Sequence, residues 1–250
     1  MKILITNDDG IHSDGLMILA DAVREAGHDV WICAPDTERS AHSHSISLKD
    51  PVKFHEIEHQ VYTCSGTPVD CVFYGLKGAL PMVPDLVLSG INRGYNVGTD
   101  IIYSGTVGAA RESAFHKIPS IAISAEGFEP PFPFEQAASF LISHLEDFLK
   151  LWTPDNVINI NVPLKPDGRW GAATPQQRDY DDKIQPFQVR DKEIFYLLSG
   201  GNSITERLVI DPGSDMDLLR RNIISVTPLY IHPAMDTVQY EAFKRLQENN

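Results

Sequence analysis

The stretch Lys2-Ile3-Leu4-Ile5-Thr6-Asn7-Asp8-Asp9-Gly10 decides how the rest of the chain is interpreted. Its first five residues form an apolar, β-branched run, which predicts a strand buried on both faces, as in a parallel sheet. Apolar residues then recur at helical spacing, with Asp14 able to cap the start of a helix and Gly27 able to end it. Two adjacent carboxylates, Asp8 and Asp9, therefore follow the first strand, at the edge where open α/β sheets bind ligands.

The adjacency of Asp8 and Asp9 has two interpretations. Two ionised carboxylates at such an edge repel each other unless a cation lies between them, and carboxylate oxygens suit a hard metal ion. The alternative is a pair of solvated loop aspartates, one of which caps the helix. These ten residues alone leave both interpretations open.

Composition and length limit the class of protein. The chain has 250 residues and a formal net charge of -13, which predicts one large α/β domain or a domain with an extension. It has no long basic tract, so we do not expect a nucleic-acid duplex as a partner. Three cysteines without a Cys-x-x-Cys pair indicate a reducing compartment. We find neither a signal-peptide pattern nor a membrane-length apolar run, so we expect a cytoplasmic protein with no membrane partner.

Strand and helix patterns alternate along the first 162 residues, which predicts a doubly wound, mostly parallel sheet. Further strands are expected at 28–35, 84–90, 120–124 and 157–163. A hairpin is expected around 52–64, followed by a helix that Thr67 caps and Pro68 opens.

Polar loops follow several of these strands. The loop at 36–45 is rich in hydroxyl groups and histidines, and the loop at 91–100 combines glycines with asparagines. Ser104 and Thr106 begin a helix of small residues, whose free N–H groups could bind an anion. Simple capping by Ser104 is the alternative. We favour the anion site because two glycine- and hydroxyl-rich segments follow one another.

The pattern changes after residue 163. Residues 164–222 carry short strand candidates at 170–174 and 193–198 among polar loops, and a strand at 223–230 and a helix at 237–246 follow. We therefore divide the chain into a Rossmann-like catalytic core, 1–163, and an extension, 164–250. The extension is expected to supply oligomerisation arms and a C-terminal helix, either in the same domain or closely packed against it.

Six short motifs occur in order along the core. They are Asn7-Asp8-Asp9-Gly10, Ala34-Pro35-Asp36 with Arg39-Ser40, Gly66-Thr67-Pro68-x-Asp70-Cys71, Ser89-Gly90-Ile91-Asn92-x-Gly94-x-Asn96-x-Gly98, Tyr103-Ser104-Gly105-Thr106-Val107 and Asn159-Ile160-Asn161-Val162-Pro163. Together they closely resemble the survival protein E (SurE) family of metal-dependent nucleotide phosphatases. The resemblance covers residues 1–163 and resumes at 225–229.

This resemblance implies a metal-dependent phosphatase that hydrolyses nucleoside monophosphates, as a homodimer or homotetramer with exchanged C-terminal elements. It implies one divalent cation per subunit, Mg²⁺ or Mn²⁺, which suits oxygen ligands. The implied site residues are Asp8 and Asp9 for catalysis, Asp8, Asp9, Ser40 and Asn92 for the metal, and Asn96, Ser104, Gly105 and Thr106 for the phosphate. Asp8 or Asp9 could orient the attacking water or take its proton, and His44 is considered for protonating the leaving group.

The chain departs from the family pattern at two positions. The family usually has proline where this chain has Tyr95, and Arg93 stands beside the implied ligand Asn92.

Two other functions compete with the phosphatase. A first strand and helix followed by Ala26-Gly27-His28-Asp29-Val30 are also typical of nucleotide-sugar glycosyltransferases, although those chains are usually longer. A non-enzymatic nucleotide-binding or receiver module would also place paired acids after its first strand.

Overall fold

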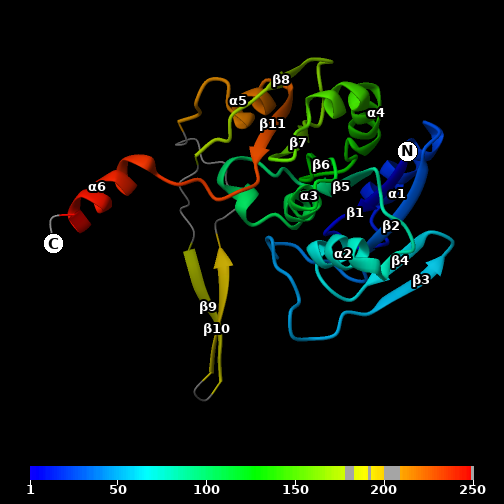
Figure 1. Ribbon diagram of the computed structural model, residues 1–250, viewed down its shortest axis with the longest axis horizontal. Coiled ribbons are helices and arrows are strands. Elements are labelled where there is room, and N and C mark those ends of the chain that lie inside the picture. The colour runs from blue at the N-terminus through cyan, green and yellow to red at the C-terminus, as the bar shows by residue number, and fades with distance from the viewer. Residues whose placement is uncertain (178–182, 191–192, 200–208, 249–250) are drawn as a thin grey trace.

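The computed structural model describes residues 1–177, 183–190, 193–199 and 209–248 (Figure 1). The strands within these ranges are β1 (Lys2–Thr6), β2 (Asp29–Pro35), β3 (Phe54–Glu58), β4 (Val61–Cys64), β5 (Leu86–Arg93), β6 (Ser120–Ala125), β7 (Asn156–Val162), β8 (Trp170–Ala172), β9 (Lys183–Arg190), β10 (Glu193–Ser199) and β11 (Ile224–Tyr230). The α-helices are α1 (Asp14–Glu25), α2 (Pro68–Tyr74), α3 (Gly105–Phe115), α4 (Phe134–Leu151), α5 (Asp215–Arg220) and α6 (Thr237–Glu248). Two short helical turns, η1 (Gly75–Ala79) and η2 (Gly98–Ile102), complete the described elements.

Within the described residues, nine strands form one mostly parallel sheet in the order β3-β4-β2-β1-β5-β6-β7-β11-β8. The central pairs are parallel, whereas β3 and β11 run antiparallel to β4 and β7. The predicted doubly wound α/β fold is therefore confirmed. Strand β1 lies between β2 and β5, so the strand order reverses beside it. A crevice at the carboxyl ends of the strands is expected at this reversal.

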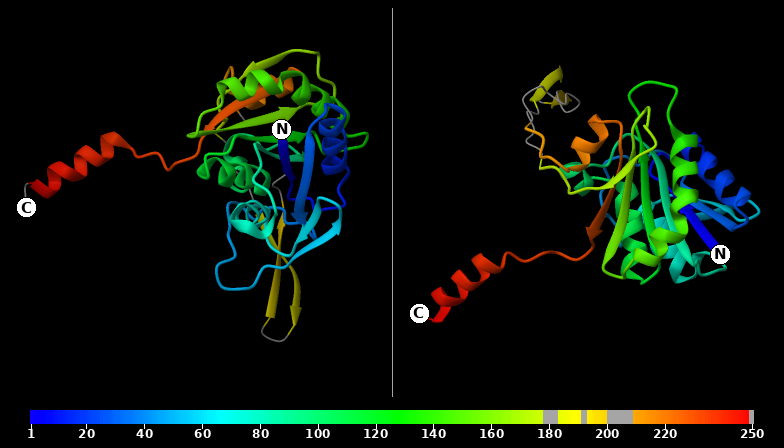
Figure 2. Two further views of the ribbon diagram at one scale, coloured as in Figure 1. Left: turned by 45° about the vertical axis from the view of Figure 1, so that its right-hand side comes forward. Right: turned by 90° about the horizontal axis from the view of Figure 1, so that it is seen from above.

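Helices cover both faces of the sheet, as the two views in Figure 2 show. On one face, Ile3 and Ile5 of β1 belong to a buried cluster with residues of α1 and α4. On the other face, Leu4 belongs to a cluster with Val72 of α2 and Ala109 of α3. The alternation along β1 is the period of two expected for a strand, and both of its faces are buried, as predicted.

Two details near the first strands differ from the predictions. Helix α1 begins at Asp14, so its N-cap is Ser13 and Asp14 does not cap it. The hydroxyl of Ser13 does not cap the helix either, and it accepts a hydrogen bond of 2.5 Å from Nδ2 of Asn7. Asn92 lies within β5 and not in the loop after it, because the strand resumes its pairing with β6 after a register shift between Ser89 and Asn92.

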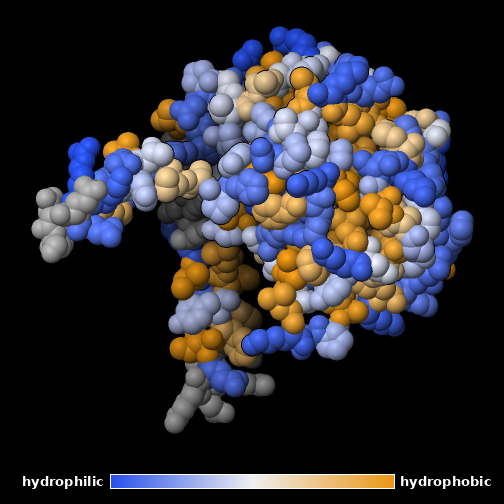
Figure 3. All heavy atoms as spheres, viewed as in Figure 1, coloured by the Kyte–Doolittle hydropathy of each residue, from blue (hydrophilic) through white to orange (hydrophobic). Residues whose placement is uncertain are grey.

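The segment after residue 163 contributes to the same sheet and also projects from it. Strands β8 and β11 pair at the sheet edge, whereas the hairpin of β9 and β10 and the helix α6 extend away from it (Figure 1). Apolar side chains lie along the exposed hairpin (Figure 3). Strand β9 and helix α5 had not been predicted. A six-residue helix is too short for its apolar spacing to stand out in the sequence.

Candidate metal and phosphate site

The side chain of Asn7 shapes the loop that carries the paired aspartates. Its Nδ2 donates to the carbonyl oxygen of Gly10 at 3.0 Å, and its Oδ1 accepts from the Gly10 N–H at 3.2 Å. Gly10 has a φ of +97°, which favours glycine, and an added Cβ would lie 3.3 Å from the carbonyl carbon of Thr37. This compact turn presents Asp8 and Asp9 at the end of β1.

Asp8 is only 5% exposed, and it lies against the start of α3. Its Oδ1 accepts a hydrogen bond of 2.5 Å from the hydroxyl of Thr106. A Cβ added at Gly105 would lie 3.0 Å from the Cβ of Asp8, so a larger residue would crowd the helix start against this carboxylate. Burial raises the pKa of Asp8, and hydrogen bonds from Thr106 and the backbone at Gly105 offset this only in part.

Asp9 is the more exposed of the two carboxylates, and its pKa is raised to about 6. The first cause is burial and the second is the neighbouring negative charge of Asp8, while the backbone N–H of Arg93 donates to Asp9 Oδ2 at 3.2 Å and lowers the pKa. Neither carboxylate forms an ion pair with a side chain in the described part of the chain. The two acids therefore lie side by side without a salt bridge, and the positive charge of Arg93 offsets only part of the rise in the pKa of Asp9.

Backbone contacts bring the segments of Ser40 and Asn92 to this pair. The N–H of Arg39 donates to the carbonyl oxygen of Asp8 at 2.7 Å, which places the following residue, Ser40, beside the loop. Ser40 is exposed, and its hydroxyl donates to Glu38 Oε1 at 2.8 Å. Asn92 precedes Arg93, and its Nδ2 donates to the carbonyl oxygen of Gly94 at 2.7 Å. Its amide oxygen has no hydrogen-bond partner among the residues that the structure describes.

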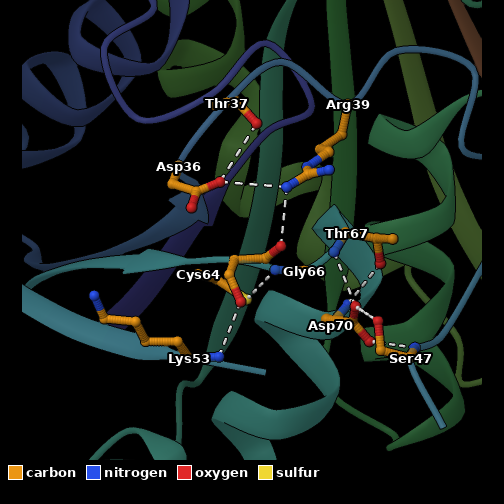
Figure 4. Close-up of polar contacts among 10 residues, drawn as sticks. Asp36, Thr37, Arg39, Ser47, Lys53, Cys64, Gly66, Thr67 and Asp70 are labelled. Carbon is orange, nitrogen blue, oxygen red and sulfur yellow. Dashed lines mark hydrogen bonds and ion pairs between the residues drawn. The ribbon is translucent and has the colours of Figure 1, made fainter. Parts of the chain in front are cut away.

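The segment that carries Ser40 is fastened at both ends (Figure 4). Near its start, the guanidinium of Arg39 donates to the carbonyl oxygen of Ser65 at 2.9 Å. Near its end, the backbone and the hydroxyl of Ser47 both donate to the carboxylate of Asp70, at 2.8 and 2.7 Å. Asp70 also forms a capping box with Thr67 at the start of α2, where Thr67 and Pro68 stand as predicted. The loop therefore rests on α2.

The donor atoms at this edge fit a hard divalent cation. The loops after β1 and β2 and the end of β5 supply two carboxylates without a salt bridge, a hydroxyl, and an amide oxygen without a hydrogen-bond partner in the described ranges. All are oxygens, which Mg²⁺ and Mn²⁺ prefer. In the described ranges we find no group of three or more His, Cys, Asp or Glu side chains arranged for a metal.

The predicted phosphate contacts lie at the start of α3 and in the neighbouring loop. Ser104 is the N-cap of α3, and its Oγ accepts from the Val107 N–H at 3.0 Å, which leaves its own proton free to be donated. The hydroxyl of Thr106 is fully buried and is engaged with Asp8. Asn96 is 7% exposed, and its Nδ2 donates to Ser124 Oγ at 2.8 Å. The structure therefore shows the capping role of Ser104, and an additional phosphate contact stays a prediction.

Two asparagines of β7 hold the loop of Asn96, and this role had not been predicted. Nδ2 of Asn159 donates to the Asn96 carbonyl oxygen at 2.8 Å, and Nδ2 of Asn161 donates to the same oxygen at 3.1 Å. Oδ1 of Asn161 accepts from the Asn96 N–H at 2.8 Å. The available signal was two amides spaced by two residues in an otherwise apolar strand, so that both face the same side.

Asp215 in α5 fixes the far end of the same loop. Its carboxylate accepts from the N–H of Gly98 at 2.7 Å and from the N–H of Gln176 at 3.1 Å. A Cβ on Gly98 would lie only 2.2 Å from the carbonyl oxygen of Gln176, so the approach needs glycine. The segment after residue 163 therefore supports the site, although no motif in the sequence identified Asp215.

The backbone of His44 packs against Gly108 in the first turn of α3, but its side chain points further along the helix. Its Nε2 forms a 2.7 Å hydrogen bond with the carboxylate of Glu112, which also contacts His116 at 3.1 Å. Glu112 follows Thr106 by six residues, which is about 9 Å along a helix at 1.5 Å per residue. His44 is therefore directed at the middle of α3, which does not favour it as the acid for the leaving group.

The fold and this arrangement define a Rossmann-like α/β protein with paired acids at the carboxyl edge of the sheet, beside a helix N-terminus. A family model described as "Survival protein SurE" matches residues 3–182, and the chain belongs to this family, as the sequence motifs predicted.

No helix in the described ranges is both long and apolar enough to cross a membrane.

Named relatives match over nearly their whole length. The chain is 40% identical to a 5'-nucleotidase SurE of Thermosipho melanesiensis, with 99% of this chain and 97% of the relative covered. It is 37% identical to a 5'-nucleotidase SurE of Synechococcus elongatus, with 98% of each covered. The crystal structure of the SurE protein from Aquifex aeolicus has a TM-score of 0.83 and 32% identity, and covers 99% of this chain and 100% of its own.

Proposed function

We propose that this protein is a metal-dependent nucleotidase that hydrolyses nucleoside monophosphates to a nucleoside and phosphate. The observation that carries the proposal is the pair Asp8 and Asp9, which forms no salt bridge in the described ranges and lies beside the start of α3. Relatives with 37–40% identity along almost the whole chain are named 5'-nucleotidases. Family membership favours this function over the glycosyltransferase and the non-enzymatic nucleotide-binding module.

In this proposal Asp8, Asp9, Ser40 and Asn92 hold one divalent cation per subunit, Mg²⁺ or Mn²⁺. When bound, the cation supplies positive charge for the phosphoryl oxygens and acidifies water. The support is the chemistry of the donors, which are all oxygens and include two adjacent acids that form no salt bridge in the described ranges. Thr106 keeps Asp8 in place, and the Arg93 N–H does the same for Asp9.

The phosphoryl group is proposed to lie at the N-terminus of α3, in contact with Asn96, Ser104, Gly105 and Thr106. Free N–H groups at a helix start favour anions, and they can hold the equatorial oxygens as charge spreads over them. Water attacks the phosphorus atom opposite the ribose oxygen, and Asp9 or Asp8 orients the water or accepts its proton. The bond between phosphorus and the ribose oxygen breaks, and that oxygen takes a proton from solvent water to give the nucleoside.

We further propose that the protein acts in the cytoplasm as a homodimer or homotetramer. The three cysteines are free and buried, which agrees with a reducing compartment. Residues 1–163 would form the catalytic core, and 164–250 would supply the arms. Exposed apolar side chains on β10 and α6 support an interface there.

The test of the function is phosphate release from AMP or GMP with Mn²⁺, with and without EDTA. We expect release that EDTA abolishes and that added Mn²⁺ restores. Release that persists in EDTA, or no release from either nucleotide with Mn²⁺ or Mg²⁺, would contradict the proposal.

A further inference from the structure

A pocket with a volume of about 270 Å³ opens next to Asp9, and none of the residues given as its lining belongs to α3. The first turn of α1 forms one wall, and Arg93 at the end of β5 and Phe132 before α4 form another. The lining also includes Asp9, His12 and Glu38. None of these side chains except Asp9 has a role in the proposed hydrolysis.

Asp9 joins this pocket to the proposed phosphate site. Asp8 and Asp9 are consecutive, and Asp8 lies against the start of α3 whereas Asp9 lines the pocket. A phosphate at the start of α3 and a group in the pocket would therefore lie on either side of the same two carboxylates. An ester with phosphate at one end and a larger group at the other could occupy both at once.

The charges around the pocket exclude a second phosphate as its natural occupant. Three carboxylates, from Asp9, Asp14 and Glu38, line it, against one arginine. The same carboxylates can accept hydrogen bonds from the hydroxyl and amino groups of a neutral ligand. The first turn of α1 can donate, because the side chain of Ser13 does not cap it.

The aromatic part of the lining suits a flat ring. The guanidinium of Arg93 lies 5.8 Å from the ring centre of Phe132, and the rings of Phe132 and Phe134 are 5.5 Å apart. Nucleic-acid bases stack on aromatic rings and on arginine planes of this kind. The volume lies near the lower end of ligand pockets, which start at about 300 Å³, and this suits a group of nucleoside size.

We propose that this pocket is the subsite for the nucleoside part of the substrate, with the base against Phe132 and Arg93. The inference rests on the proposed nucleotidase function and names the part of the chain that recognises the base. It makes Phe132 a residue that determines the preference for nucleotides over other phosphate esters.

The experiment compares AMP with ribose 5-phosphate, which keeps the phosphate ester and lacks the base. The variants are Phe132→Ala and, as a matched control, Phe128→Ala, a 63% exposed ring of the same loop that does not line the pocket. We expect Phe132→Ala to lower kcat/KM for AMP about tenfold, mainly through KM, because base stacking on an aromatic ring is lost. Its activity on ribose 5-phosphate, and both activities of Phe128→Ala, should match the wild type.

The activity on ribose 5-phosphate also shows that Phe132→Ala is folded. The inference would be overturned if the ratio of kcat/KM for AMP to kcat/KM for ribose 5-phosphate were the same in a folded Phe132→Ala protein as in the wild type. Adenosine binding in EDTA, measured by ligand-observed NMR, tests the subsite without catalysis. If no ester is hydrolysed, the proposed function fails, and adenosine binding then tests the subsite by itself. Weaker adenosine binding by Phe132→Ala than by the wild type supports the subsite, and equal binding overturns it.

Discussion

Thr106 and Asp8 are 98 positions apart in the sequence, and the Thr106 hydroxyl donates a hydrogen bond of 2.5 Å to Asp8 Oδ1. This contact joins the helix that is proposed to hold the phosphate to the acid that is proposed to hold the metal. Both residues are buried, so the geometry is set by packing and by one polar contact.

Replacement of Thr106 by valine keeps the shape of the side chain and removes the donor to Asp8. We expect the affinity for Mn²⁺ to fall about tenfold or more, because groups that orient a metal ligand typically contribute that much. Thr106→Ser keeps the hydroxyl and should stay near the wild type. Titration of activity with Mn²⁺ measures the effect, and equal Mn²⁺ dependence in Thr106→Val and the wild type would show that the contact does not position Asp8.

The raised pKa of Asp9 predicts how the metal-free protein responds to pH. A carboxyl group whose pKa rises from 3.8 to about 6 on folding stabilises the fold below pH 4, and this contribution is lost as the pH rises through 6. The loss amounts to roughly 3 kcal/mol at 1.36 kcal/mol per pKa unit. The free energy of unfolding, measured with urea in EDTA, should therefore rise in Asp9→Asn relative to the wild type as the pH increases from 4.5 to 7. A difference between the two proteins that is independent of pH would contradict this.

Ser104→Ala and Asn96→Ala should impair turnover and leave the metal bound, because both residues are placed for the phosphate. Loss of a contact made only in the transition state lowers kcat, whereas loss of ground-state binding raises KM. Ser104→Ala also removes the cap of α3, which costs about 1 kcal/mol of stability, so a Ser104→Thr variant serves as the control that keeps the cap. Loss of Mn²⁺ binding in Ser104→Ala or Asn96→Ala would refute this division between phosphate and metal residues.

The exposed apolar residues after position 163 predict an oligomer. Phe195 to Leu198 in β10 are all at least 45% exposed, and so is Phe243 in α6. A two-stranded ribbon is marginally stable alone in water, so burial against a second subunit is expected. Light scattering at micromolar concentration should give a multiple of 27.8 kDa, and a single species at that mass would contradict the prediction. Removal of residues 237–250 should weaken association before it affects the metal site.

The local sequence was sufficient to predict the core of the fold. The apolar run of β1, the alternation of strands and helices, and the capping pair Thr67 and Pro68 all follow from short-range patterns, and the structure contains them. The N-cap of α1 was misassigned because the helix already begins at Asp14, which places Ser13 at the N-cap, and this start depends on how the preceding turn folds.

Long-range contacts in the site could not be predicted from spacing. Asn159, Asn161 and Asp215 hold the loop of Asn96 and Gly98 from positions more than sixty residues away. The bond between His44 and Glu112 likewise depends on where the loop after β2 crosses α3. Such contacts follow from the packing of distant segments, and neither residue type nor periodicity encodes them locally.

The most direct test of the account is calorimetric titration of Mn²⁺ into the EDTA-treated and dialysed protein. The account predicts one binding site per chain in the wild type and in Asp21→Asn, an exposed acid of α1 that serves as the control. It predicts no measurable site in Asp8→Asn or Asp9→Asn, both folded by circular dichroism and without turnover of AMP. Unchanged Mn²⁺ binding in a folded Asp8→Asn or Asp9→Asn protein would contradict the assignment of these two carboxylates to the metal.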